Sequence, residues 1–133
     1  TVISLLVFQT AATTISVGDV SLTDTQNNIK NSSGTITATA KGGLLSKKTN
    51  TITITNESGT TGTLTFDYSI SKQSSYSVDG ATPGTSGSFS KTLAAGNSVV
   101  ISVTSNNGFS NLTKSYFSFL ISSILFFTGY LYA

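Results

Sequence analysis

Short runs in which apolar and polar residues alternate fill the middle of the chain and limit what it can fold into. The clearest run spans residues 64–70, where Leu, Phe, Tyr and Ile alternate with Thr, Asp and Ser. Similar runs occupy 35–40, 51–55 and 99–103. A period of two gives a strand one buried and one solvated face, as in antiparallel sheets. The middle of the chain is therefore predicted to be all-β, without helices.

Residues that favour turns separate these runs. Asn56-Glu57-Ser58-Gly59, Asp79-Gly80, Pro83-Gly84, Ala94–Asn97 and Asn106–Gly108 follow or precede them, and Gly and Asn accept the positive φ of tight turns. About seven short strands with turns at this spacing predict an antiparallel β-sandwich. The predicted core comprises Ile36, Ile52, Ile54, Leu64, Phe66, Tyr68, Ile70, Val78, Phe89, Leu93, Val99, Ile101 and Val103.

The distribution of charge divides the chain into three parts. No charged residue precedes Asp19, and none follows Lys114. We expect an apolar N-terminal segment at 1–17, a β-sandwich domain at 18–110 and an apolar C-terminal segment at 111–133. A length of 133 residues suits a single domain.

The composition excludes most catalytic chemistry. The chain has 23 Thr and 23 Ser but no His, Cys, Trp, Met or Arg. Without His and Cys it lacks the usual ligands of transition metals, the commonest acid–base catalyst and any disulfide. The net charge of +2 comes with no basic stripe, so nucleic-acid binding is not expected. We expect an extracellular structural protein that is not an enzyme and holds no cofactor or metal.

The remaining chemical candidates have weak patterns. The five acidic residues Asp19, Asp24, Glu57, Asp67 and Asp79 form no motif, and Asp67 is predicted to face solvent. Ser88 and Lys91 have Ser-x-x-Lys spacing, but within a strand pattern. Asp24, Asn27 and Asn28 could offer oxygen atoms to calcium, although their spacing fits no EF-hand. Gly42-Gly43 is interpreted as a turn.

Two features of the Thr, Ser and Asn content have possible functional meaning. Asn31, Asn56 and Asn111 each begin an Asn-x-Ser/Thr sequon, which makes them candidate N-glycan acceptors. Asn31 and Asn56 are favoured because both fall in predicted turns. The Thr-x-Thr runs at 35–39, 51–55 and 61–65 invite comparison with ice-binding ladders, but their spacing is irregular and outward-facing Thr on exposed strands is the simpler interpretation.

Three stretches together resemble a known family. They are Asn50–Gly59, Gly62–Tyr68 and Leu93–Val103, and they are similar to the immunoglobulin-like β-sandwich modules of bacterial and archaeal surface proteins. Ala95 stands where Pro is commoner in those modules. Similar heads occur in archaeal pilins and in TasA-like fibre subunits. The resemblance implies a β-sandwich architecture and favours a filament subunit, although such sandwiches serve many functions.

The N-terminal run Val2–Phe8 is apolar on both faces of a would-be strand. It fits four interpretations. It could be a core strand of its own domain, or a donor strand that completes a neighbouring subunit. It could also be a short pilin-type helix in a filament core, or the end of a signal peptide with Thr10-Ala11-Ala12 as the cleavage site.

The C-terminal stretch 116–133 carries no charge and is also open to several interpretations. As a helix of about 27 Å it would nearly span a bilayer or pack in a filament core. It could equally form buried or exchanged strands, or a removable anchoring signal.

We therefore predict a structural subunit of an extracellular surface filament, a pilus-like fibre that assembles from copies of itself through apolar terminal segments. The alternative is a membrane-anchored, adhesin-type surface module whose segment 116–133 contacts lipid as a transmembrane helix. The candidate subunit-bridging residues are Val2, Ile3, Leu5, Leu6, Val7, Phe8, Phe117, Phe119, Ile121 and Leu125.

Overall fold

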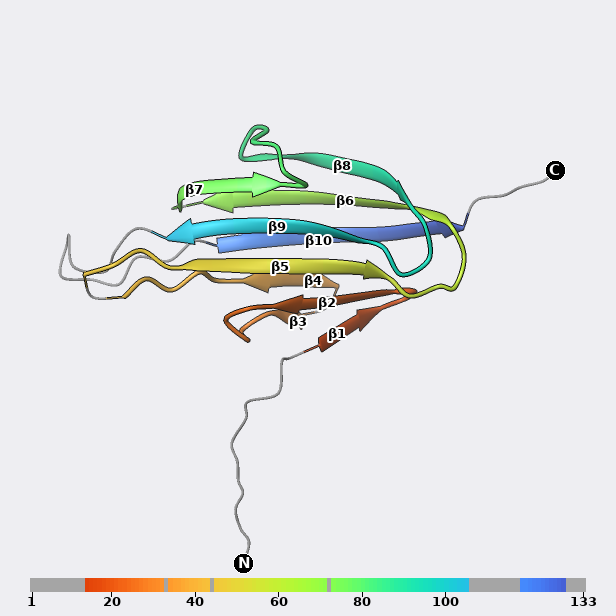
Figure 1. Cartoon of the computed structure of the whole chain (residues 1–133), viewed down its shortest axis with the longest axis horizontal. Helices are drawn as coiled ribbons and strands as arrows, with labels where there is room; N and C mark the ends of the chain where they lie inside the picture. Colours follow the sequence, from red (N-terminus) through yellow and green to blue (C-terminus); the bar gives the residue numbers. More distant parts are fainter. Residues whose placement is uncertain (1–13, 33, 44, 72, 106–117, 129–133) are drawn as a thin grey trace, which may run out of the picture.

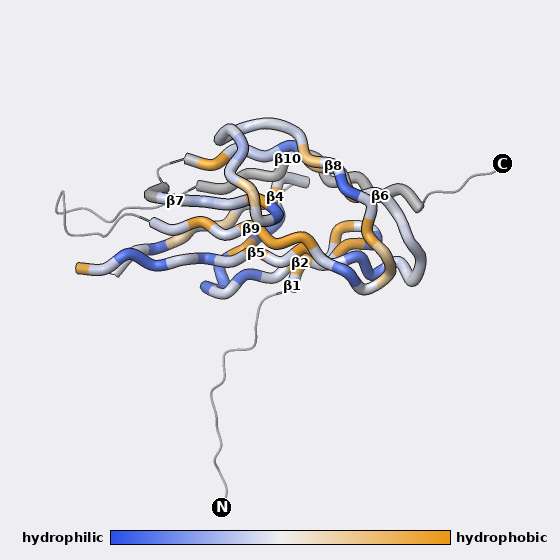
Figure 2. The backbone as a smooth tube through the Cα atoms, turned by 45° about the horizontal axis from the view of Figure 1, so that its top comes forward, coloured by the Kyte–Doolittle hydropathy of each residue, from blue (hydrophilic) through white to orange (hydrophobic). Residues whose placement is uncertain are grey.

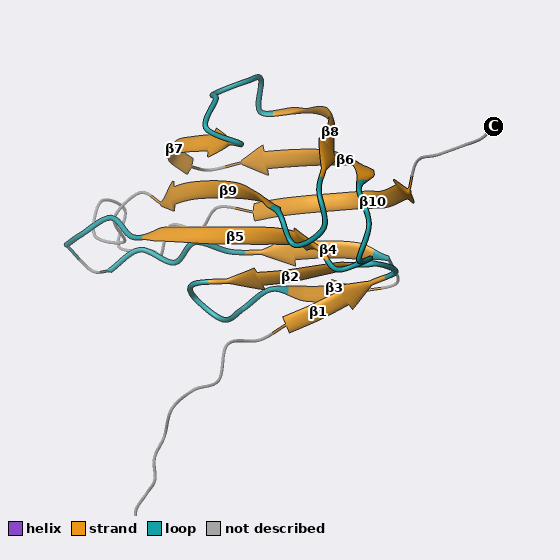
Figure 3. Cartoon of the chain, turned by 45° about the vertical axis from the view of Figure 1, so that its right-hand side comes forward, coloured by secondary structure: helices purple, strands orange, loops and turns teal. Residues whose placement is uncertain are grey.

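The computed structural model describes residues 14–32, 34–43, 45–71, 73–105 and 118–128. Within them the chain forms strands, turns and loops but no helix (Figure 3). The strands are β1 (Thr14–Val17), β2 (Val20–Asp24), β3 (Lys30–Ser32), β4 (Thr35–Ala38), β5 (Thr49–Asn56), β6 (Gly62–Ser71), β7 (Gln73–Val78), β8 (Ser86–Leu93), β9 (Ser98–Ser105) and β10 (Ser118–Thr128). The prediction of an all-β chain is confirmed for this part.

The ten strands form two antiparallel sheets of five that lie against each other (Figure 1). One sheet has the order β1-β2-β5-β9-β7 and the other has the order β3-β4-β10-β6-β8. Only β1–β2 and β3–β4 are consecutive strands that pair in one sheet; every other connection crosses to the opposite sheet. The sheets are therefore interlocked by the path of the chain.

The core between the sheets comes from the alternating runs. In β5 every second residue is buried, from Asn50 to Asn56, and Ile52 and Ile54 are fully enclosed. Twelve of the thirteen predicted core residues are buried, and Phe89 is partly buried against them. Orange segments of the tube in Figure 2 follow these strands. Val20, Leu22, Ile29, Ala38 and Ala40 complete the core.

Local sequence explains several of the turns. Gly18, with φ of 59°, takes the first central position of the β1–β2 hairpin, as a type II′ turn requires. Asp79 and Gly80 both have positive φ and close a two-residue turn between Val78 and Ala81, whose backbones bond in both directions. The turn at Asp79-Gly80 was predicted from the sequence, whereas the one at Gly18-Asp19 was not.

The expectation of seven strands omitted β1, β3 and β10. β1 and β3 are short edge strands of four and three residues, and Lys30-Asn31-Ser32 has no apolar residue to reveal it. β1 lies before residue 18 and β10 after residue 110, so the two sheets include residues from both predicted terminal segments.

β10 is the central strand of its sheet, between β4 and β6. The structure therefore differs from the helical interpretation of 116–133 over Ser118–Thr128. The register shifts between Ile121 and Ser123: Phe119 lies opposite buried Ile70 before the shift, and Phe126 lies opposite buried Leu64 after it. The bulge changes the phase of the strand, and apolar residues occupy register positions on both faces, since Leu120 and Leu125 lie opposite Ser69 and Thr65. The strand interpretation of 116–133 agrees with the structure over Ser118–Thr128. No helix among the described residues could cross a bilayer.

Candidate functional site

The acidic residues are spread over the sandwich rather than gathered in one place. Within the described ranges no three acidic side chains lie close enough to share a metal ion. Asp67 is exposed and accepts a hydrogen bond from the Ser88 hydroxyl at 2.6 Å. Lys91 pairs with Asp79 at 2.8 Å. Ser88 and Lys91 thus have separate acidic partners, and the arrangement offers no Ser–Lys nucleophile.

A buried polar cluster closes the end of the sandwich where β5 begins. Asp24 is only 3% exposed, and Asn50 is fully buried. The Asp24 carboxylate accepts hydrogen bonds from the backbone N–H of Asn28 at 3.0 Å, from that of Ile29 at 3.3 Å and from Nδ2 of Asn50 at 2.9 Å. Three N–H donors occupy its acceptors, so in this fold Asp24 is an internal hydrogen-bond acceptor and not an open calcium ligand.

The same cluster joins loops that lie far apart in sequence. Asn28 exchanges two hydrogen bonds with the backbone of Thr39, at 2.7 and 2.8 Å. Asn50 Nδ2 also donates to the Thr39 carbonyl at 3.0 Å. The Gln26 side chain accepts from Lys41 N–H at 2.8 Å. The β2–β3 and β4–β5 loops are thereby fixed to each other and to β5.

Asn56 closes the opposite end of β5. It is 1% exposed, and its Nδ2 donates to the carbonyls of Thr60, Leu93 and Ala94 at 2.8, 3.1 and 3.2 Å. Its Oδ1 accepts from Ser58 N–H at 2.8 Å. This nitrogen is the atom that a glycan would occupy. Asn56 is therefore a structural residue of the β5–β6 turn, and its selection as a favoured glycan acceptor conflicts with its burial.

The other two sequons differ from Asn56. Asn31 lies exposed on edge strand β3, where its Oδ1 accepts a hydrogen bond from Gly34 N–H at 2.9 Å. Asn111 lies outside the described residues. Among the described sequons, only Asn31 presents its side chain to solvent.

The Thr-x-Thr runs do not combine into one ladder, because 35–38 and 62–65 belong to one sheet and 51–55 to the other. Instead, the outer face of the β1-β2-β5-β9-β7 sheet carries hydroxyls on every strand. Cross-strand pairs join them: Thr49 to Thr104 and Thr55 to Ser98, both at 2.8 Å. Val100, 40% exposed, is the large apolar residue on this face. This hydroxyl-rich face, with the Glu57 carboxylate bound by Ser21 at one end at 2.8 Å, agrees with outward-facing Thr on exposed strands.

Two tyrosines fasten the loop that covers the edge of β7. The hydroxyl of Tyr76 donates to the Pro83 carbonyl, and that of Tyr68 donates to the Gly84 carbonyl at 3.1 Å. Burial raises the pKa of Tyr68 above its usual value, and Tyr76 adds to the shift. Thr82 donates to the Tyr76 carbonyl at 3.2 Å, and Val78 N–H bonds to the Ala81 carbonyl at 2.7 Å. Three of the backbone groups that β7 turns away from β9, the Tyr76 carbonyl and both groups of Val78, are therefore occupied.

Strand β8 is a longer edge. It spans eight residues, and among the described strands it pairs with β6 alone. Ile70 N–H bonds to the Thr85 carbonyl, so by the alternation of antiparallel ladders the backbone groups of Ser86, Ser88, Ser90 and Thr92 point away from β6. No described strand pairs with this side of β8. Unpaired strand edges of this kind recruit other chains.

Phe89 lies on the core-facing side of β8, opposite Phe66. Its ring stacks on that of Phe66 with centroids 5.0 Å apart, but Phe89 is only partly buried. A strand added beside β8 would bury the remaining surface. The β8 edge thus combines backbone groups that no described strand pairs with and a partly exposed aromatic ring, and an added strand would use both.

The predicted bridging residues fall in two groups. Val2, Ile3, Leu5, Leu6, Val7, Phe8 and Phe117 lie outside the described residues. Phe119, Ile121 and Leu125 lie on β10, which pairs with β4 and β6 of the same chain.

Sequence reasoning missed Asn50, and it named Asp24 and Asn56 as surface candidates without foreseeing their burial. Their signal was nevertheless present: Asn50 and Asn56 continue the inward phase of Ile52 and Ile54 at both ends of one run. A polar residue in the buried phase of an alternating strand must find hydrogen-bond partners inside the fold.

Comparison of the chain with models of protein families, with curated proteins and with solved structures finds no match. The resemblance to immunoglobulin-like surface modules therefore has no support from these comparisons.

Proposed function

We propose that this protein is a structural subunit of an extracellular surface filament, in which each subunit inserts its apolar segment Val2–Phe8 beside a strand edge of the next. The observation that carries the proposal is the β8 edge: an eight-residue strand, four of whose residues turn backbone groups outward, with a partly exposed Phe89. We also propose that the sandwich is related to immunoglobulin-like surface modules and that Asn31 carries a glycan where the host attaches one.

The donor and the edge match in length and chemistry. Val2–Phe8 contains seven residues, six of them apolar, and no charge. As a strand it would cover about 24 Å, close to the length of β8. Its two apolar faces could cover Phe89 on the core side while its backbone groups pair with Ser86, Ser88, Ser90 and Thr92.

The other edges are poorer acceptors. β1 and β3 have four and three residues. On β7, the outward groups of Val78 bond to Ala81 and the Tyr76 carbonyl accepts from Thr82. Lys91 is a charge on β8 itself, of the kind that discourages edge pairing, but its bridge to Asp79 holds it toward the β7 turn.

The first experiment is negative-stain electron microscopy of native material sheared from cells after detergent extraction. Regular fibres are the expected result. Single small heads in detergent micelles, with no fibres under any assembly condition, would contradict the proposal and favour a membrane-anchored module.

Variants of the recombinant chain then test the proposed contact between Val2–Phe8 of one subunit and β8 of the next. Leu5→Lys, within the apolar run, should abolish fibres, whereas Gln9→Lys, just beyond it, should leave them intact. Ser90→Pro removes an outward N–H from β8 and should also block assembly, because proline cannot donate to an added strand. Ser16→Pro makes the same change on the β1 edge and should assemble normally. Thermal unfolding of each variant shows whether the head still folds.

A further inference from the structure

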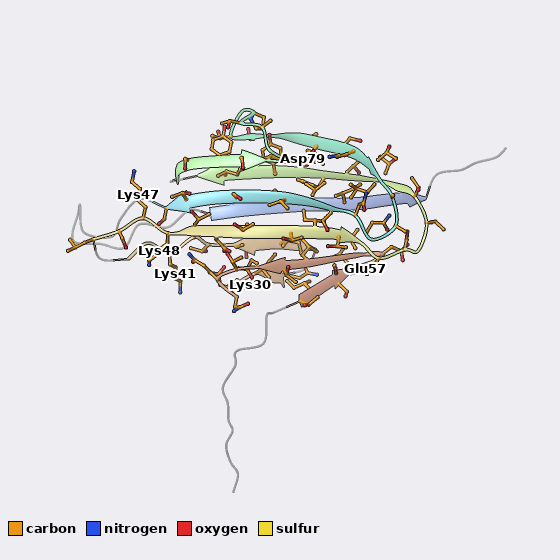
Figure 4. The ribbon with its side chains drawn as sticks, in the orientation of Figure 1. Lys30, Lys41, Lys47, Lys48, Glu57 and Asp79 are labelled. Carbon is orange, nitrogen blue, oxygen red and sulfur yellow. The ribbon has the colours of Figure 1, made fainter. Side chains whose placement is uncertain are left out.

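Six of the ten described charges are exposed toward the two ends of the sandwich, basic at one end and acidic at the other. Lys30, Lys41, Lys47 and Lys48 lie toward the end where β5 begins (Figure 4), and all four are exposed. Lys48 is fixed there by the exchange of hydrogen bonds between its backbone and Ser105, at 2.9 and 3.3 Å. None of these lysines has an ion pair within the described residues.

The opposite end carries acidic residues. Glu57 follows the last residue of β5, and Asp19 occupies the β1–β2 turn. Their loops are joined, because Glu57 N–H donates to the Asp19 carbonyl at 2.8 Å, and both side chains are exposed. β5 separates the two ends by eight residues, or about 25 Å.

The remaining charges do not cancel this polarity. Asp24 is buried at the basic end and reduces its net charge from four to three. Lys91 and Asp79 neutralise each other, and Asp67 lies exposed midway along β6. The described residues contain five lysines and five acidic residues. This part therefore has no net charge, but its positive and negative charges are separated along the direction of the strands. Lys72 and Lys114 lie outside the described residues.

We infer that neighbouring subunits meet end to end, with the basic end of one head facing the Asp19–Glu57 end of the next. The inference rests on the proposed filament and adds its polarity: the strands run roughly along the fibre and all heads point one way. The binding partner is a second copy of this chain, because the same molecule presents the complementary charge at its other end. Single exposed pairs contribute little, but grouped opposite charges orient the approach and raise association rates by ten-fold or more.

Salt gives the first measurement. Fibre growth of the full-length chain is followed by light scattering from about 0.01 M to about 1 M salt, which shortens the Debye length from about 30 Å to about 3 Å. Growth should slow by about ten-fold or more over this range. Growth that is unchanged or faster in high salt would overturn the inference.

Charge reversal supplies the decisive measurement. The double variant Lys47→Glu with Lys48→Glu makes both ends acidic, and Asp19→Lys with Glu57→Lys makes both ends basic. Each variant alone should grow about ten-fold more slowly than the natural chain, whereas an equimolar mixture should recover, because unlike heads can alternate. Thr23→Glu with Val100→Glu adds two negative charges midway along the outer face, in the row of Thr53, and should leave growth unchanged.

The outcomes separate the two proposals. If the natural chain forms no fibres, the proposed function fails. If it forms fibres but the reversed variants grow as fast as it does, or their mixture shows no recovery, the end-to-end contact is wrong while the filament stands. Fibre growth independent of these lysines, together with loss of binding to an anionic polymer such as polyglutamate in the lysine variant, would assign the basic end to an anionic partner instead.

Discussion

The ends of the sandwich and its β8 edge differ in whether their polar groups have partners within the described residues. At each end of β5 a buried asparagine gathers loops from distant parts of the chain, and its donors and acceptors have partners inside the fold. Along β8 the outward backbone groups of four residues have no described strand beside them. Saturated polar clusters of this kind hold a fold together, whereas an unsaturated edge is available to a partner.

Loss of the Asp24 carboxylate should have the largest effect on this contrast. Asp24→Ala leaves two backbone N–H groups and Asn50 Nδ2 without their acceptor. We expect the free energy of unfolding to fall by about 3 kcal/mol or more, measured by urea denaturation. Asp67→Ala removes an exposed carboxylate and should change it by less than about 0.5 kcal/mol. Equal effects of the two variants would mean that the cluster does not close this end.

Asn56 tests the opposite end with a smaller expected loss. Asn56→Ala removes the donor to three carbonyls, and we expect about 2 kcal/mol of destabilisation in the same assay. Asn31→Ala, on the exposed edge strand, is the matched control and should be nearly neutral. A neutral result for Asn56→Ala would remove the distinction between buried and exposed sequons.

Tyr68, which holds the loop beside β7, should make the stability of the fold depend on pH. Because burial raises its pKa in the folded state, its contribution to stability is complete below about pH 10 and is lost as pH rises through the folded value. Tyr68→Phe should flatten this alkaline loss and remove about 1 kcal/mol at neutral pH, since the bond to Gly84 disappears. Thermal unfolding at pH 8 and pH 11 compares the two chains; parallel losses would contradict the assignment.

The smallest effect on stability is expected at Asn31. In a host that attaches N-glycans, Asn31→Gln should remove one glycan from the intact mass without changing the melting temperature. Asn56→Gln should remove none, because the buried Nδ2 already has three carbonyl partners. A glycan found on Asn56 by peptide mass spectrometry would show that this end opens.

Much of the core was readable because it is a local property. The alternation at 64–70 and 99–103 predicted both the strands and their buried faces, and Asp-Gly at 79–80 predicted a turn. Asn56 was interpreted as a turn residue open to a glycan, because the sequon and the turn signal are local while its burial depends on Leu93 and Ala94. β10 was ambiguous because its apolar residues are consecutive rather than alternating, and a bulge shifts its register between Ile121 and Ser123.

The sequence by itself determined the all-β class, the inward phase of the main strands and the absence of most catalytic side chains. Only the tertiary structure decided which asparagines are enclosed, which strand edges are covered and which end holds the exposed lysines. The physical reason is one of range: alternation and turn propensity act over a few residues, whereas an edge is open or closed only in relation to strands that the chain places there from far away. The Asp24–Asn50 bond, across 26 positions, exists only after the sheets have formed.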